Sequence, residues 1–218
     1  MQSKEEYRMK KFKIRKIEMY KKYIKRIIDF VISFIVLILF SPLYVLIAVL
    51  IKIKDNGPIF YKQNRTGKDG KIFKIYKFRT MKDGKVTKIG KVLRTTSLDE
   101  IPQFYNVLKG DMSIIGPRPW IPDYYDNFNE EQRERTLVKP GLVGLAQVNG
   151  RKMINIFDKI NYDIKYVKNL SLCLDLKIIL KSMKIIIAKE NIGEVDIYIK
   201  KEIEMLKSQK DFFTNVNN

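Results

Sequence analysis

The chain has 218 residues, a length that fits one domain and can bury a sizeable core. It contains no histidine, which excludes imidazole bases, histidine metal ligands and Ser-His or Cys-His nucleophile systems. The single cysteine, Cys173, can form neither an internal disulfide nor a cysteine zinc site, and this favours a reducing compartment. The formal net charge of +19 indicates a polyanionic partner: nucleic acid, anionic lipid or a phosphate-bearing substrate.

Residues 1–24 form a basic segment with apolar residues at a rough helical spacing. This pattern is typical of an amphipathic helix that lies at an anionic membrane interface. The same composition also suits a solvated, partly frayed arm. We therefore keep both interpretations of this segment.

Residues 25–55 contain the longest apolar run, the 22 residues from Phe30 to Ile51, and about 20 are needed to cross a bilayer. Basic residues flank the run at both ends, which favours a re-entrant helix with both ends in the cytoplasm. Pro42 removes a backbone hydrogen bond near the middle of the run, where Ser41 can satisfy a freed carbonyl. A kinked single span is the first alternative. A buried soluble helix is the second, and the run is apolar around its whole circumference, which disfavours it.

Residues 56–190 are predicted to be a cytoplasmic catalytic domain. Short alternating segments before and after the turn-rich stretch Thr66–Gly70 predict a small β-hairpin within Pro58–Met81. Helical patterns follow at Leu98–Leu108, Asn129–Leu137, Phe157–Asn169 and Leu174–Lys189. We expect an α+β fold that is mainly helical. Residues 191–218 are predicted to be a variable C-terminal tail.

The densest group of reactive side chains surrounds Asp99 and Glu100. Ser97 and Glu100 match a capping box, which requires no catalysis. A second register puts Pro102 at the first helical position and leaves both carboxylates just ahead of the helix. In either register the positive end of the helix favours the ionised carboxylates. An ionised aspartate can act as a nucleophile or as a magnesium ligand.

Two further segments have features of anion binding. Arg118 lies between two prolines, which fix its backbone and present the guanidinium at a defined place. The glycine-rich stretch Lys139–Arg151 is compatible with backbone amides that approach a phosphate. The chain has no Walker or Rossmann glycine motif, so a nucleotide must be held in another way.

In this order, the segments resemble the bacterial sugar transferases that act as small monotopic polyprenyl-phosphate phosphoglycosyl transferases. The resemblance runs from about Lys25 to Glu190. It is carried by seven blocks, Pro58–Gln63, Lys77–Met81, Thr96–Gln103, Asn106–Ser113, Gly116–Pro119, Gly141–Arg151 and Leu174–Lys177. The break of the family's re-entrant membrane helix falls on Ser41 and Pro42, and its Asp-Glu dyad falls on Asp99 and Glu100.

The resemblance implies a Mg²⁺-dependent, two-step transfer of a phosphosugar from a UDP-sugar to polyprenyl (undecaprenyl) phosphate. Asp99 attacks the sugar-bearing phosphate, UMP leaves, and the lipid phosphate takes the phosphosugar from the enzyme. This would be the first membrane step of glycoconjugate assembly (capsule, exopolysaccharide, O-antigen or glycoprotein glycan), at the cytoplasmic face of the bacterial inner membrane.

The resemblance also assigns further residues to the site. Asp99 and Glu100 would hold Mg²⁺, and the anionic substrates would be bound by a lysine and four arginines: Lys77, Arg79, Arg94, Arg118 and Arg151. Lys152 departs from the asparagine that many relatives have after Gly-Arg, which affects local substrate contacts. The larger relatives have additional N-terminal membrane helices, so we expect this chain to be the minimal catalytic form.

A different class of function is a non-catalytic, basic protein tethered to the membrane, for which the charge and the anchor suffice. Nucleic acid is not expected as a partner, because no nucleic-acid-binding module is visible and the long apolar segment would have no use. Release of UMP from a UDP-sugar distinguishes the enzyme from both alternatives.

Overall fold

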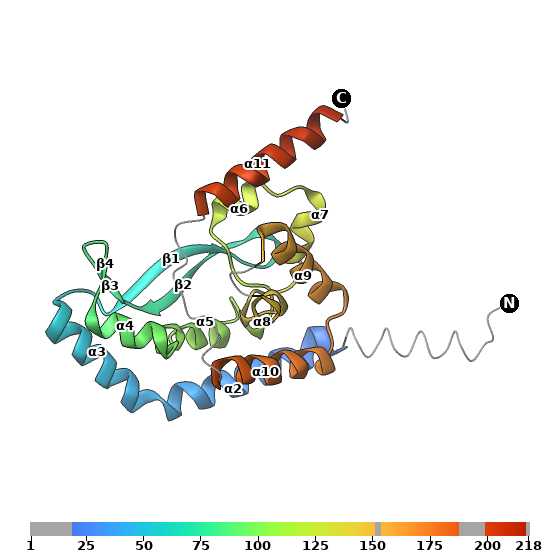
Figure 1. Cartoon of the computed structure of the whole chain (residues 1–218). Helices are drawn as coiled ribbons and strands as arrows, with labels where there is room; N and C mark the ends of the chain where they lie inside the picture. Colours follow the sequence, from blue (N-terminus) through green and yellow to red (C-terminus); the bar gives the residue numbers. More distant parts are fainter. Residues whose placement is uncertain (1–18, 151–153, 188–198, 217–218) are drawn as a thin grey trace.

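The computed structural model describes residues 19–150, 154–187 and 199–216 (Figure 1). Most of the basic segment predicted at 1–24 therefore lies outside the described residues. The fold is α+β and mainly helical, as predicted, with three two-stranded sheets.

Two helices form a bent pair at the N-terminal side of the fold. After a π-helical turn, η1 (Tyr20–Ile24), helix α2 runs over Lys25–Leu39 and helix α3 over Ser41–Asp55. The chain bends by 60° between them, at Phe40. Ser41 and Pro42 are the first residues of α3, where the missing amide of proline breaks no helical bond. No single described helix is long and apolar enough to cross a membrane, and the bent pair of α2 and α3 meets that requirement by length and composition only when taken together.

The start of α2 is attached to the rest of the fold by polar contacts. Arg26 donates hydrogen bonds to the carbonyls of Val107 (2.6 Å) and Leu108 (2.7 Å) near the end of helix α5 (Gln103–Lys109). A cation at the carboxyl end of a helix interacts favourably with the last carbonyls and with the helix dipole. Asp29 is buried and accepts a bond from the amide of Ile114 at 3.0 Å. One side of an otherwise apolar helix is therefore fixed to the domain.

A buried carboxylate, Asp175, joins three elements. It lies in helix α10 (Leu172–Ile187) and pairs with Lys25 at 2.6 Å. The hydroxyl of Tyr20 donates to it at 2.6 Å, and that of Tyr166, in helix α9 (Ile156–Lys168), at 2.7 Å. The first turns of α2 are thereby tied to α9 and α10, and α2 and α10 run along the same edge of the molecule in Figure 1.

The predicted hairpin is confirmed and lies against α5. Strands β1 (Phe60–Thr66) and β2 (Ile72–Phe78) are antiparallel, joined by a turn that contains the 3-10 segment η2 (Lys68–Gly70). The side chain of Asn106, in α5, donates to the carbonyl of Lys74 and accepts from the amide of Tyr76. A buried amide that bonds the strand backbone in this way fixes the hairpin against the helix.

The chain then passes through a second small hairpin, β3 (Met81–Lys82) and β4 (Lys85–Val86), to helix α4 (Lys88–Thr95) and the 3-10 turn η3 (Leu98–Glu100). The sequence patterns did not predict α4. The helix predicted at Leu98–Leu108 is divided into η3 and α5, which begins at Gln103.

A short parallel pair, β5 (Ser113–Ile115) and β6 (Gly141–Val143), follows α5. The two strands meet through glycine, because a Cβ atom on Gly141 would lie 2.1 Å from the backbone nitrogen of Gly116. Two glycines of the segment that we interpreted as an approach to phosphate, Gly141 and Gly144, therefore lie against the backbone of Gly116. This contact fixes the chain just before Arg118, since the amide of Gly141 donates to the carbonyl of Pro117 at 2.9 Å.

In Figure 1, α6, α7 and α11 lie at the top of the fold, and α8 and α9 lie between them and α10. Four short elements, α6 (Pro122–Asp126), α7 (Glu130–Arg133), η4 (Glu134–Thr136) and α8 (Leu145–Asn149), precede the longer helix α9, whose predicted range was Phe157–Asn169. Helix α11 (Ile199–Val216) lies within the segment expected to be a tail. Its Leu206 is 1% exposed in a core cluster with Tyr124 and Ile160, and Glu202 pairs with Lys159 at 2.7 Å.

We predict that Asp175→Asn lowers the free energy of unfolding by about 3 kcal/mol, because it leaves the charge of Lys25 buried without a partner. The side chains of Lys25 and Asp175 are only 12% and 5% exposed. Chemical denaturation of the purified protein measures the change. Asp69→Asn is the matched control: that aspartate is 52% exposed, and its loss should change stability by less than about 0.5 kcal/mol. Equal stability of the two variants would contradict the importance of the Asp175 network.

Candidate active site

Asp99 and Glu100 lie in the turn η3, between α4 and α5. The capping box predicted for Ser97 and Glu100 is wrong, because the Ser97 side chain makes no cap bond and its backbone is left-handed, with φ 57°. The structure is closer to the second register, in which the carboxylates precede the helix: Pro102 is the residue just before α5. A non-glycine residue with positive φ costs free energy and is common beside functional sites.

Two cations that come from different parts of the fold converge on Glu100. Lys77, in β2, donates to Oε1 of Glu100, and Arg118, in the loop after β5, donates to the same oxygen at 3.1 Å. Both of these residues were predicted to belong to the site. The two bonds use one carboxylate oxygen and leave Oε2 outside both of them.

The two carboxylates have opposite pKa shifts. Burial alone would raise the pKa of Glu100, but the charges and hydrogen bonds of Arg118 and Lys77 outweigh burial and hold it well below its usual value. Burial and the charge of Glu100 raise the pKa of Asp99, with Lys77 and Arg94 acting against them. The expectation that the helix start favours both ionised forms is therefore wrong for Asp99. Environments that separate two pKa values in this way assign two carboxylates to different roles.

Arg118 is held in place by a second arginine, which the sequence patterns did not single out. Arg135 donates to the backbone carbonyl of Arg118 at 2.8 Å. Its own charge is balanced by Asp163 at 2.7 Å, with side chains only 3% and 2% exposed. The Arg135 guanidinium also lies 4.0 Å from the ring centroid of Trp120, a cation–π contact. Arg135 and Asp163 are 28 residues apart and share no short motif, so their role is visible only in the folded structure.

The other predicted cations divide into three cases. Arg94 is near the dyad: its charge acts on Asp99, and its Nε donates to the hydroxyl of Thr80 at 2.9 Å. Arg79 contacts a different element: it donates to the carbonyl of Asp55, at the end of α3, at 3.0 Å. Arg151 lies outside the described residues. The structure thus brings together Asp99, Glu100, Lys77, Arg94 and Arg118.

One further basic side chain lies at this site and was missed. Arg65, in β1, is close enough to Arg118 and Glu100 for both charges to affect its pKa. Alternation along the strand could have found it, because Arg65 and Tyr61 share a face of β1 and Tyr61 pairs with Lys77.

The dyad is a small donor set for a metal ion. Within the described ranges, no group of three or more Asp, Glu, His or Cys side chains could hold one. Mg²⁺ is commonly bound by one or two carboxylates together with substrate phosphates and water. Asp99 and the free Oε2 of Glu100 fit this mode of binding.

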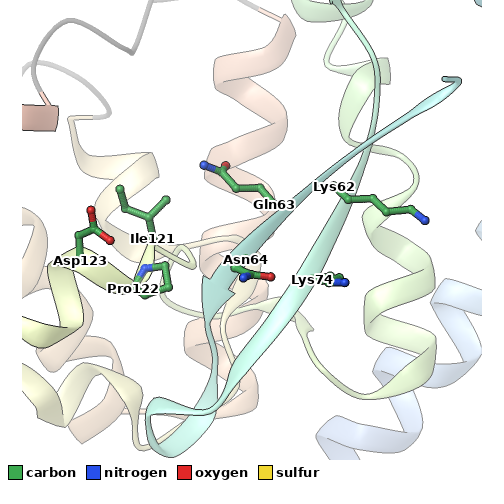
Figure 2. A pocket seen from close by; sticks show the side chains of 7 residues that line it. All are labelled: Lys62, Gln63, Asn64, Lys74, Ile121, Pro122 and Asp123. Carbon is green, nitrogen blue, oxygen red and sulfur yellow. The ribbon is translucent and has the colours of Figure 1, made fainter. Parts of the chain in front are cut away.

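A separate hollow of about 640 Å³ lies beside the hairpin (Figure 2). It is lined by three consecutive residues of β1, one residue of β2 and the start of α6: Lys62, Gln63, Asn64, Lys74, Ile121, Pro122 and Asp123. None of the dyad or its cations lines it. The chemistry that the carboxylates can perform is therefore located outside this hollow.

Comparison with known proteins identifies the family. Residues 20–189 match the family model described as bacterial sugar transferase. The chain is 43% identical, over 76% of its length, to a UDP-N-acetylgalactosamine-undecaprenyl-phosphate N-acetylgalactosaminephosphotransferase of Aeromonas hydrophila. It is 42% identical, over 71%, to a UDP-glucose:undecaprenyl-phosphate glucose-1-phosphate transferase of Klebsiella pneumoniae. It is 38% identical, over 79%, to the uncharacterized sugar transferase EpsL of Bacillus subtilis.

The matched regions cover 44% of the Aeromonas protein and 38% of the Klebsiella protein, so the chain matches less than half of these two relatives. They cover 92% of the Bacillus protein. The family model covers most of this chain, including the dyad and both cations that bind Glu100. The chain belongs to the bacterial sugar transferase family.

Proposed function

We propose that this chain transfers a phosphosugar from a UDP-sugar to polyprenyl (undecaprenyl) phosphate and releases UMP, as the first membrane step of glycoconjugate assembly. The observation that carries the proposal is the carboxylate dyad with Lys77 and Arg118 on Glu100. The names of the Aeromonas and Klebsiella relatives, both undecaprenyl-phosphate sugar phosphotransferases, support it. A non-catalytic binding protein would not require two carboxylates with separated pKa values.

In the proposed mechanism Asp99 is the nucleophile. Its carboxylate oxygen attacks the sugar-bearing phosphorus of the UDP-sugar, the bond from that phosphorus to the bridging oxygen breaks, and UMP leaves with that oxygen. An oxygen of the lipid phosphate then attacks the same phosphorus and releases Asp99. The raised pKa of Asp99 supports this role, because a more basic carboxylate is a better nucleophile.

Glu100 and its two cations have a positioning role in this proposal. The low pKa of Glu100 keeps it ionised throughout, so it does not compete with Asp99 for a proton. Lys77 and Arg118 would contact the transferred phosphate as well as Glu100, and the charge of Arg94 acts on Asp99. Asp99 and Glu100 would hold Mg²⁺, which when bound neutralises charge that develops on the phosphate oxygens.

The exposed apolar residues of α2, α3 and α10 support a monotopic position in the membrane. On α10 they recur every three or four residues along one face: Leu172, Leu176, Leu180 and Met183. On α2 and α3 many are about half exposed or more, including Phe34, Ile38, Leu39, Val45 and Ile53. A continuous apolar surface of this kind marks contact with lipid or with another protein. We infer that the α2–α3 pair is a re-entrant helix and that α10 lies at the cytoplasmic interface of the inner membrane.

Asp99→Asn should lower turnover by about a thousandfold or more, because the amide keeps the size of the side chain and loses its nucleophilicity. Purified protein incubated with a UDP-sugar and Mg²⁺, without lipid acceptor, should carry a phosphosugar adduct on Asp99 that mass spectrometry detects. The control Asp83→Asn changes an exposed turn residue with φ 48°, which asparagine tolerates, and should react normally. An adduct on a different residue would overturn the assignment.

Glu100→Gln should destabilise the protein at neutral pH and lose this effect in acid. The folded pKa of Glu100 is depressed, so its ion pairs contribute full stability above the unfolded value of 4.5. As the pH falls below that value towards the folded pKa, the unfolded state gains a proton and the contribution is lost. Urea denaturation of both proteins from pH 7 to pH 3 measures the difference. If the difference in free energy of unfolding between the two proteins grew as the pH falls, the predicted pH dependence would be wrong.

The re-entrant model predicts that residues 10 and 60 lie on the same, cytoplasmic, side of the membrane. Single cysteines at these positions, in a Cys173→Ala background because Cys173 is exposed, should both be protected from a membrane-impermeant maleimide in intact cells. Both should react after the cells are opened. Labelling of only one of the two sites in intact cells would indicate a single span.

A further inference from the structure

Three guanidinium groups surround the backbone from Arg118 to Trp120, and only two of them are electrically balanced. Arg118 pairs with Glu100, and Arg135 pairs with Asp163. Arg65 donates towards the carbonyl of Pro119 at 3.4 Å and forms no ion pair with any described residue. Lys77 shares the carboxylate of Glu100 with Arg118, so the site contains more positive charge than its carboxylates neutralise.

The surroundings of Arg65 make this charge costly. Its Nη2 donates to Oε1 of Gln63 at 2.6 Å, while its Nε is inaccessible to solvent and has no hydrogen-bond partner among the described residues. Burial, followed by the charge of Arg118, lowers the pKa of Arg65. A guanidinium with a buried, unpartnered nitrogen and no carboxylate partner is unfavourable unless an anion balances its charge.

The register of the hairpin directs Arg65 towards the dyad. Arg65 pairs with Phe73 and Tyr61 pairs with Lys77, so Arg65, Tyr61 and Lys77 share one face of the hairpin. Lys62 and Lys74, on the opposite face, line the hollow of Figure 2 together with Gln63. Gln63, which accepts from Arg65, supports the orientation of the guanidinium from two residues away on the same strand.

We propose that Arg65 is a binding residue for the diphosphate of the nucleotide-sugar donor, and that its guanidinium and that of the neighbouring Arg118 hold the phosphate oxygens beside the dyad. This rests on the proposed function, which it deepens by assigning a residue to the donor diphosphate. A planar guanidinium can donate two parallel hydrogen bonds to one phosphate, which a lysine cannot do. Two adjacent arginines also repel each other, and a dianionic ligand removes that repulsion.

The test measures binding of UDP with Mg²⁺, by isothermal titration calorimetry on the full chain in lipid nanodiscs. Arg65→Met should weaken binding about tenfold or more, because it removes a charged hydrogen-bond donor from the diphosphate. Arg65→Lys keeps the charge, loses the fork, and should weaken binding by a smaller but measurable factor. Lys74→Met is the matched control: it removes one exposed positive charge from the opposite face of the same hairpin and should bind UDP within about twofold of wild type.

UDP affinity in Arg65→Met equal to that of wild type, with circular dichroism showing that the variant is folded, overturns the proposal. If Arg65→Met does not fold, the UDP affinity of Arg65→Lys is the deciding measurement. A UDP affinity of Arg65→Lys equal to that of wild type then overturns the proposal. Wild-type protein that fails to bind UDP also overturns it. Release of UMP by wild-type protein is assayed separately across a panel of UDP-sugars. Failure of that assay with normal UDP titrations rejects the transfer reaction and leaves the binding role of Arg65 in place.

Discussion

The site depends on one shared acceptor, the carboxylate of Glu100. Lys77 reaches it from the β1–β2 hairpin and Arg118 from the loop after β5. These two parts of the chain belong to different sheets and are also joined by a backbone hydrogen bond from Thr66 to Trp120, at 2.8 Å. Each cation needs its own support. Asn106 fixes the hairpin on α5, and Arg135 with its partner Asp163 fixes the backbone of Arg118. Loss of either support would displace Lys77 or Arg118 and so change the environment of Glu100.

The bent helix pair is partly an element of the domain and partly a free apolar arm. Asp29 and Ser33 are buried, 4% and 0% exposed, and lie one helical turn apart on the face of α2 that contacts the domain. Ile27 and Ile38, on the outer side, are 62% and 58% exposed. The polar contacts made by Lys25, Arg26 and Asp29 fix how the apolar arm leaves the domain. The position of the arm relative to the dyad is therefore set by hydrogen bonds rather than by apolar packing alone.

The sequence predicted the features that depend on local patterns. Alternation and turn residues gave the hairpin, and a 3.6-residue period gave α9 and α10. Features that depend on contacts between distant segments were missed. The strands β5 and β6 have three residues each and form because two glycine backbones approach closely, which no periodicity signals. Arg79 follows the end of β2 and turns to the last carbonyl of α3, although it is only two residues from Lys77. The capping box failed because two cations compete for Glu100.

In the proposed re-entrant position, the angle between α2 and α3 limits how deep the pair can reach into a membrane. Each arm has 15 residues, a length of about 22 Å, and a symmetric chevron of two such arms bent by 60° has a height of only about 11 Å. One leaflet contributes about 15 Å of hydrocarbon, half of the bilayer core. A chevron of this height, inserted point first, ends within the leaflet that it enters and displaces lipid from that leaflet alone. Insertion would expand this leaflet relative to the other one, which favours a membrane surface that is convex on the side of the protein. The chain should therefore bind small vesicles, whose outer surface is strongly curved, more tightly than large ones.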